Sequence, residues 1–277
     1  MKVDSPAVMA AVEALATHAL PAFGIALLLV LAGVTVLWQL GQHYGVRRQE
    51  SRWPPIAYLA GHLVLGFAVI AGSAALFAGI AEELGEGEQL GRLDLLFSDT
   101  LRSTLTREVL QIFAVLTHLG DPAVLSVLCV LVASLLLLRH QRLLAAGWVL
   151  AVAGNALLNP ALKGIFARTR PVHDHGFASA QGWSFPSGHA SSSVVVYGML
   201  AYLLVRLLPA HWPAGLRLAA VLLATALAFV TGSSRVFLQV HFASDVLAGF
   251  ASGTAWLAVC IGTLELVRYR TGRRPAP

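Results

Sequence analysis

Charged residues are scarce in this chain. Asp, Glu, Lys and Arg make up 12% of its 277 residues, about half the share of a typical soluble domain. Hydrophobic residues make up 57%, and the mean hydropathy is +0.73. Only two cysteines occur, Cys129 and Cys260, and both lie in apolar stretches, so no disulfide framework is expected. The net charge is +5, but the arginines occupy short loops between apolar runs, which argues against a nucleic-acid partner.

The apolar residues form blocks of the length needed to cross a bilayer core of about 30 Å. There are seven of them, at residues 20–40, 56–80, 122–138, 143–162, 188–208, 215–234 and 242–266. Lipid offers backbone N–H and C=O groups no partner, so the predicted fold class is all-α, a polytopic transmembrane helical bundle of about seven spans. Residues 92–118 have the mixed pattern of one amphipathic helix lying along the outer membrane interface.

The division of the chain follows from these blocks. Residues 1–55 are expected to contain a surface helix, starting after Ser5-Pro6, and an extra N-terminal span. Residues 56–266 are expected to form a single membrane domain, and residues 267–277 a basic cytoplasmic tail.

Alternate loops carry the positive charge. Arginines follow the first, third and seventh blocks and flank the loop after the fifth, whereas four glutamates follow the second. The arginines are Arg47, Arg48, Arg52, Arg139, Arg142, Arg206, Arg217, Arg268, Arg270, Arg273 and Arg274, and the glutamates are Glu82, Glu83, Glu86 and Glu88. Because positive loops stay in the cytoplasm, the C-terminus is predicted inside and the N-terminus outside. Loops 163–187 and 235–241 are then predicted to lie at the outer face.

The first of three polar clusters lies just after the fourth block. Lys163, Arg168 and Arg170 fall within eight positions at the predicted outer boundary, where the orientation rule disfavours cations. A phosphate ligand would explain them, because Arg offers a planar pair of donors and Lys a compact charge. Taken alone, these residues are equally compatible with long side chains reaching the lipid headgroups.

The second cluster, residues 184–190, reads Ser-Phe-Pro-Ser-Gly-His-Ala and directly precedes the fifth block. Free N–H groups at the start of that helix, together with the Ser187 hydroxyl, would form an anion site, which Gly188 lets a ligand approach closely. His189 adds a group that can donate a proton near neutral pH. An ordinary helix cap beside an interfacial histidine remains the alternative.

The third cluster runs from Ser234 to Asp245 and includes Arg235 and His241. His241 and Asp245 are four residues apart, so they share one face of a helix. A carboxylate at the start of a membrane helix needs a partner. If Asp245 accepts a hydrogen bond from one ring nitrogen, the other nitrogen is free to act as nucleophile or base. A purely structural His–Asp pair is the alternative.

Together the clusters contain what phosphoryl transfer requires: cations for the phosphoryl oxygens, a nucleophile and an acid for the leaving oxygen. They resemble the three signature motifs of the type 2 phosphatidic acid phosphatase superfamily, which includes membrane lipid phosphate phosphatases and soluble vanadium haloperoxidases. Lys-x6-Arg-Pro matches Lys163 to Pro171, Pro-Ser-Gly-His matches Pro186 to His189, and Ser-Arg-x5-His-x3-Asp matches Ser234 to Asp245. The motif-bearing region spans about residues 93–266. Membrane members of this family typically have six spans, so the role of residues 1–45 is left open.

The resemblance implies a role for each matched residue. His241 would attack phosphorus and form a phosphohistidine, Asp245 would hold its ring, and His189 would protonate the leaving group. The phosphoryl oxygens would be held by Lys163, Arg170, Arg235, Ser187 and Gly188, with Arg168 and Ser234 as auxiliary residues. Such enzymes work without a metal, so no cofactor is expected. His173, Asp174 and His175 are interpreted as loop residues at the rim of the site rather than as metal ligands.

The resemblance also implies a lipid phosphate or lipid diphosphate as substrate, with its chain remaining among the membrane lipids. The candidates are an isoprenoid diphosphate such as undecaprenyl diphosphate, phosphatidic acid, phosphatidylglycerol phosphate and a lipid A phosphate. A phosphotransferase that passes the phosphoryl group to a second lipid or sugar is the alternative. A transporter would require polar residues deep in several spans, and only Asn155 and Asn159 are clear cases. The composition suits a bacterial inner membrane with a periplasmic site, and the oligomeric state is left open.

Overall fold

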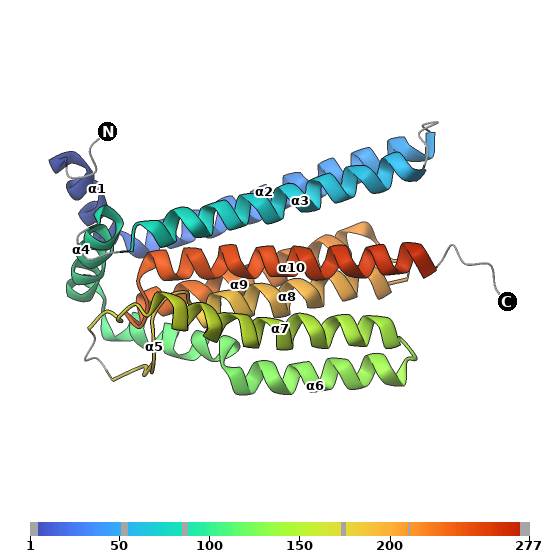
Figure 1. The fold of residues 1–277 in the computed structure, drawn as a ribbon. Helices are drawn as coiled ribbons and strands as arrows, with labels where there is room; N and C mark the ends of the chain where they lie inside the picture. Colours follow the sequence, from blue (N-terminus) through green and yellow to red (C-terminus); the bar gives the residue numbers. More distant parts are fainter. Residues whose placement is uncertain (1–4, 51–54, 85–87, 173–175, 210, 272–277) are drawn as a thin grey trace.

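A computed structural model of the chain describes residues 5–50, 55–84, 88–172, 176–209 and 211–271, and in these the regular structure is entirely helical. Long helices run side by side, and α1 and α4 lie across one end of them (Figure 1). In chain order the elements are α1 Pro6–Thr17, α2 Ala19–Glu50, α3 Pro55–Glu82, α4 Gln89–Thr104, α5 Arg107–Leu116, the 3-10 turn η1 Thr117–Gly120, α6 Pro122–Leu138, α7 Arg142–Phe166, α8 Gly188–Leu207, α9 Ala214–Phe237 and α10 Ala243–Thr271.

Seven helical stretches in the described part are long and apolar enough to cross a membrane. They are Ala19–His43, Leu63–Glu82, Arg107–Leu138, Arg142–Phe166, Gly188–Leu207, Ala214–Phe237 and Ala243–Thr271. The prediction of an all-α bundle with about seven spans is therefore confirmed.

The prediction of one amphipathic helix over residues 92–118 is wrong. Leu105 and Thr106 have extended backbone angles, with ψ of 132° and 161°, so the helix breaks there into α4 and α5. After the break, α5 buries Leu110 and Phe113 and continues through η1 into α6, and together they form the third candidate span. Of the two helices α4 and α5, only α4 lies across the end of the bundle, as Figure 1 shows.

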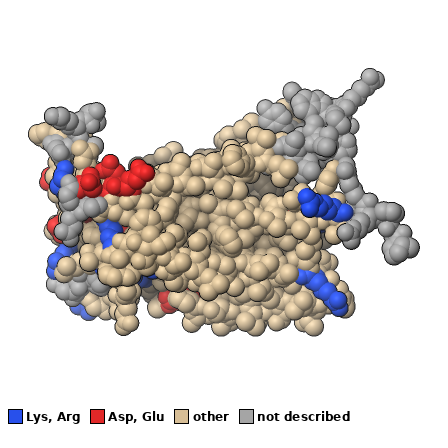
Figure 2. Space-filling model, in the orientation of Figure 1, with Lys and Arg blue, Asp and Glu red and all other residues tan. Residues whose placement is uncertain are grey.

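The centre of the bundle is formed by α7, α8, α9 and α10. Trp148, Val195 and Met199 are completely buried there. Large aliphatic side chains on the outside are exposed instead, as a lipid-facing surface requires: Leu138 is 78% and Leu157 is 76% exposed. Figure 2 shows charged residues at the two ends of this face and an uncharged band between them.

The extra N-terminal span packs against the motif-bearing helices. The Phe23 ring, on α2, lies 5.7 Å from Phe113, 5.5 Å from Phe229 and 5.5 Å from Phe237, measured between ring centroids. Phe237 is the last residue of α9 and follows Arg235 closely in the sequence. The span whose role the sequence left open therefore supports the helix that ends at the third motif.

The ends of the bundle differ in what they carry. The segments that follow α7 and α9, which contain the predicted site residues, lie at the same end as α1 and α4 (Figure 1). The α6–α7 turn with Arg139, and the last turn of α10 with Arg268 and Arg270, lie at the opposite end. This separation agrees with the alternation of charge along the sequence.

Candidate active site

The three sequence clusters meet at one end of the bundle because each lies where a long helix begins or ends. Ala167 ends α7 in a left-handed conformation with φ of 43°, and the chain then turns back past Arg168 and Arg170. Ser187 caps the start of α8, its hydroxyl accepting a hydrogen bond from the N–H of Ala190 at 3.4 Å. Gln239, with φ of 52°, lies in the short turn between α9 and α10 that presents His241.

His241 is buried and oriented at both ring nitrogens. Its Nδ1 lies 3.3 Å from Asp245 Oδ2 and 3.3 Å from the Ser184 hydroxyl, and its Nε2 lies 3.1 Å from Arg170 Nη1. Burial lowers the pKa of His241 to about 3, although the hydrogen bond that its ring makes to the Asp245 carboxylate acts in the opposite direction. A neutral ring that donates Nδ1–H to the carboxylate carries its lone pair on Nε2, facing the cations.

Arg168 occupies a position that the sequence interpretation did not foresee. Its Nη1 donates to Asp245 Oδ1 at 2.7 Å and to the Ser244 hydroxyl at 2.8 Å, while its Nη2 donates to Asp94 Oδ2 at 2.9 Å. The guanidinium also lies 4.2 Å from the centre of the Phe242 ring. Arg168 therefore holds Asp245 rather than extending towards a bound phosphate.

Asp94, on α4, is a residue of this region that sequence reasoning missed. It is 5% exposed and accepts hydrogen bonds from the Ser244 hydroxyl, from Ser244 N–H at 3.2 Å and from Arg168. Burial raises the pKa of Asp94, and the hydrogen bonds from Ser244 and Arg168 oppose that rise. The sequence carries one signal for it, because the spacing of Asp94 from Gly91 and Leu101 puts these residues on one face of a helix. The structure buries that face of α4.

Lys163 and Arg170 bind the loop that precedes the second motif. Lys163 Nζ donates to the Trp183 carbonyl at 2.5 Å and to the Ser184 carbonyl at 3.1 Å. Arg170 donates to carbonyls of residues 181–183 at 2.9 to 3.1 Å and to the Val240 carbonyl at 2.6 Å. Burial lowers the pKa of Arg170. Both predicted phosphate-binding cations therefore lie beside His241 and join it to this loop.

Arg235 lies deeper than the other two cations. It is 5% exposed, and its Nη1 donates to the Thr117 hydroxyl at 2.7 Å. Its Nε is buried and has no hydrogen-bond partner among the described residues. Arg235 interacts electrostatically with both Lys163 and Arg170, so three like charges converge here. A bound anion would relieve their repulsion.

His189 is held by a carboxylate that the sequence interpretation did not assign. Its Nε2 lies 3.2 Å from Asp121 Oδ1, and Asp121 Oδ2 lies 2.6 Å from His118 Nδ1. Asp121 stands at the N-cap of α6, where its side chain makes no capping hydrogen bond. The Asp-Pro pair before an apolar run indicates a helix start but gives no sign that the carboxylate binds a distant histidine. His189 also interacts electrostatically with Arg235 and Arg170, which places it at the same site.

The remaining predicted residues have different surroundings. Ser187 is fully buried, and its N–H donates to the Asp245 carbonyl at 2.9 Å, which joins the start of α8 to α10. Gly188 begins α8 beside it. The Ser234 hydroxyl donates to the Thr231 carbonyl at 2.6 Å within its own helix. The rim residues His173, Asp174 and His175 lie outside the described residues.

Known proteins resemble this chain in the region that contains the three motifs. The family model described as the PAP2 superfamily matches residues 142–268, which include all three motifs. Phosphatidylglycerophosphatase B of Bacillus subtilis (strain 168) is 33% identical over 148 residues, or 52% of this chain and 69% of that protein. This chain belongs to the PAP2 superfamily. The resemblance inferred from the three motifs is confirmed.

A solved structure shows that the likeness extends to the fold. The crystal structure of the first transmembrane PAP2 type phosphatidylglycerolphosphate phosphatase from Bacillus subtilis superimposes with a TM-score of 0.67 and 26% sequence identity. The match covers 72% of this chain and 98% of that one. The chain is thus a multi-span PAP2-type membrane lipid phosphatase.

Proposed function

We propose that this PAP2 phosphatase hydrolyses its lipid phosphate through a phosphohistidine formed on His241. The observation that carries the proposal is the orientation of the His241 ring. Its Nδ1 faces Asp245 at 3.3 Å, and its Nε2 faces the cationic group at 3.1 Å from Arg170. An imidazole held in this way carries its lone pair on Nε2, on the side of the cations where an anion binds best.

In the first step, Nε2 of His241 attacks phosphorus while the bond from phosphorus to the leaving oxygen breaks. The charge on the phosphoryl oxygens is balanced by Lys163, Arg170 and Arg235, with the Gly188 N–H and the Ser187 hydroxyl as further contacts. His189 in its protonated form gives a proton to the leaving oxygen, and Asp121 stabilises that charged ring from 3.2 Å.

In the second step, water attacks the phosphorus of phosphohistidine and the nitrogen–phosphorus bond breaks. The now neutral His189 takes a proton from this water, so that His241 and the charge of His189 are both restored as phosphate leaves. The three cations supply the positive charge that a metal supplies in other phosphatases. We therefore expect activity to persist in the presence of a chelator.

Phosphatidylglycerol phosphate is the first substrate to test, because the similar curated protein and the similar solved structure are both named for it. We propose that it is hydrolysed at the outer face of a bacterial inner membrane, with the C-terminus in the cytoplasm. The alternation of arginine-rich loops supports this orientation. A site at the end of the bundle lets the phosphate reach the cations while the chains stay in lipid.

The test uses purified protein in detergent with chelator and a panel of lipid phosphates and diphosphates. We expect His241→Ala to lower phosphate release about a thousandfold or more, because the covalent route is lost. His211→Ala, at an exposed position at the other end of the bundle, is the matched control and should keep activity. Full activity of His241→Ala would refute the mechanism. Adding a lipid or sugar acceptor tests phosphotransfer, which would form a phosphorylated acceptor in place of free phosphate.

A further inference from the structure

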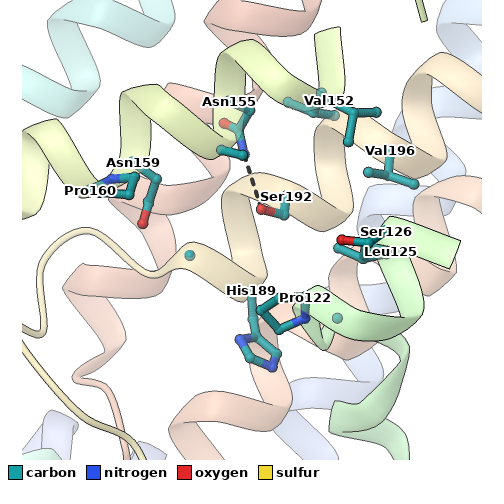
Figure 3. Close-up of a pocket in the computed structure, with 14 residues that line it drawn as sticks. Pro122, Leu125, Ser126, Val152, Asn155, Asn159, Pro160, His189, Ser192 and Val196 are labelled. Carbon is teal, nitrogen blue, oxygen red and sulfur yellow. Dashed lines mark hydrogen bonds between the residues drawn. The ribbon is translucent and has the colours of Figure 1, made fainter. Parts of the chain in front are cut away.

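A cavity of about 270 Å³ lies directly beside His189, between α6, α7 and α8. The labelled side chains in Figure 3 come from these three helices, with His189 and Pro122 close together and Asn155 bonded to Ser192. The cavity begins at the start of α8, where Gly188 and His189 line it, and reaches Val152, about four turns before the end of α7, so it extends inside the predicted membrane boundary. Its volume is slightly below the roughly 300–1,000 Å³ of typical small-molecule sites, which suits a headgroup-sized fragment rather than a whole lipid.

One wall of this cavity is polar. Asn155 and Asn159 are 2% and 7% exposed, and their amide nitrogens donate to the hydroxyls of Ser191 and Ser192 at 3.0 to 3.4 Å. These hydrogen bonds use only the nitrogen of each amide, so with respect to the described residues both amide oxygens are available as acceptors. The Asn159 oxygen is close to the phosphate site, since it lies 3.1 Å from where a Cβ on Gly188 would be.

Pro160 leaves a further acceptor, the Ala156 carbonyl, without its helical partner on the same wall. It lies inside α7 and has no N–H, so the carbonyl of Ala156 lacks its usual helical donor. Ala156 and Pro160 both line the cavity. Polar groups at this depth in a membrane bundle are costly unless they find partners, which points to a ligand that donates hydrogen bonds.

Most of the remaining lining is aliphatic, with side chains such as Leu125, Val152, Val195 and Val196. Among the lining residues only His189 can become charged, so the lining carries no permanent charge. A second phosphate placed here would be an anion without a fixed cation, which is strongly disfavoured in an apolar setting. The cavity therefore suits a neutral alcohol that has hydroxyl groups and an aliphatic part.

We propose that this cavity is the subsite for the leaving alcohol, and that Asn155 and Asn159 select phosphate monoesters whose alcohol carries a further hydroxyl group. The inference rests on the proposed function, in which His189 protonates the leaving oxygen. The leaving group must then lie on the His189 side of the phosphate, and His189 lines the cavity. Glycerol-type alcohols fit the site, whereas lipid diphosphates, whose leaving group is itself a phosphate, do not.

The test compares three substrates on purified protein: a 1-alkylglycerol 3-phosphate, an alkyl phosphate of equal chain length, and farnesyl diphosphate. The wild-type protein should favour the hydroxylated monoester in kcat/KM. Asn155→Ala and Asn159→Ala should each lower kcat/KM about fivefold to tenfold for that substrate, as expected for one lost hydrogen bond, and less than twofold for the alkyl phosphate. Leu157→Ala, on the lipid-facing side of the same helix, is the matched control and should change neither value.

A second measurement needs no variant. Free 1-alkylglycerol should inhibit the wild-type protein more strongly than the alkanol of equal chain length, because only the glycerol reaches the amide oxygens. Equal inhibition by both alcohols, or equal losses on both monoesters in the asparagine variants, would overturn the subsite. Loss of the phosphohistidine mechanism is a separate result, since it appears as full activity in His241→Ala while the substrate preference is read from the wild type.

Discussion

Arg168 is bonded to two carboxylates that reach it from different helices, Asp94 on α4 and Asp245 on α10. Its side chain is 9% exposed, and those of the carboxylates are 4% and 0% exposed. Removing one partner from such a buried group typically costs about 3–5 kcal/mol, because the remaining charges lose their compensation. Asp94 thus acts on His241 only indirectly, through Arg168 and Asp245, and is a positioning residue.

Replacing Asp94 with Asn should weaken this control of the His241 ring. We expect Asp94→Asn to lower kcat about tenfold to a hundredfold with little change in KM, because a charge-assisted hydrogen bond is lost away from the bound substrate. Steady-state kinetics on one lipid phosphate measure both values. Asp99→Asn, at an exposed position on the same helix, is the control and should stay within twofold of the wild type.

A different result would show that the Asp94 contact only stabilises the fold. In that case the melting temperature of Asp94→Asn would fall while kcat of the folded protein stayed at the wild-type value. Equal kcat in the Asp94 and Asp99 variants would contradict the positioning role.

At the scale of the helices, the second and third motifs depend on close packing between α8 and α10. A Cβ added to Gly249 would lie 2.6 Å from the Ser187 carbonyl oxygen and 2.8 Å from the Ala190 Cβ. The hydrogen bond from Ser187 N–H to the Asp245 carbonyl also holds α8 and α10 together at this contact. The distance between these helices therefore sets the distance between His241 and the predicted phosphate-binding residues at the start of α8.

Gly249→Ala should push the start of α8 away from α10. We expect it to destabilise the protein by about 1–3 kcal/mol, the usual effect of overpacking, and to lower phosphatase activity at least tenfold. Gly262→Ala on the same helix is the matched control, because a Cβ there meets nothing within 4 Å among the described residues. Thermal unfolding in detergent and phosphate release measure the two effects. Equal behaviour of the two variants would show that the spacing of α8 and α10 is not critical.

At the scale of the whole molecule, the site and the C-terminal end of α10 lie at opposite ends of the bundle (Figure 1). The sidedness prediction can be checked with single-cysteine variants in a background lacking Cys129 and Cys260. Glu88→Cys, at the site end, should react with a membrane-impermeant maleimide on intact cells. Gln141→Cys, in the α6–α7 turn, should react only after permeabilisation, and both positions are exposed. The reverse pattern would place the site in the cytoplasm.

Much of the architecture could be predicted from local composition. Block length and hydropathy located the spans, because a helix that crosses lipid must satisfy its own backbone and present apolar side chains over about 30 Å. The division at Leu105 and Thr106 was not predicted, since leucines and charged residues alternate similarly on both sides of it. Backbone angles at two residues separate α4 from α5, and the packing of α5 onto the bundle explains why it joins the third span.

The residues grouped by the three motifs do converge at one end of the bundle, and this could be predicted because the charge pattern assigned each motif to a helix end at the same membrane face. Their partners could not be predicted in the same way. Asp121 binds a histidine 68 positions away, and Asp94 binds residues 74 and 150 positions away. Such contacts leave no periodic signal, so they depend on how the helices pack.

The amino-acid sequence by itself determined the number of spans, the family and the residues available for phosphoryl transfer, because apolar length and short motifs act locally. Only the tertiary structure decided which carboxylate holds each histidine, that Arg168 pairs with Asp245, and that an uncharged cavity adjoins His189. Those features arise where helices distant in sequence meet. There the side chains lose contact with water and gain contacts with one another, and this burial determines which charges must pair.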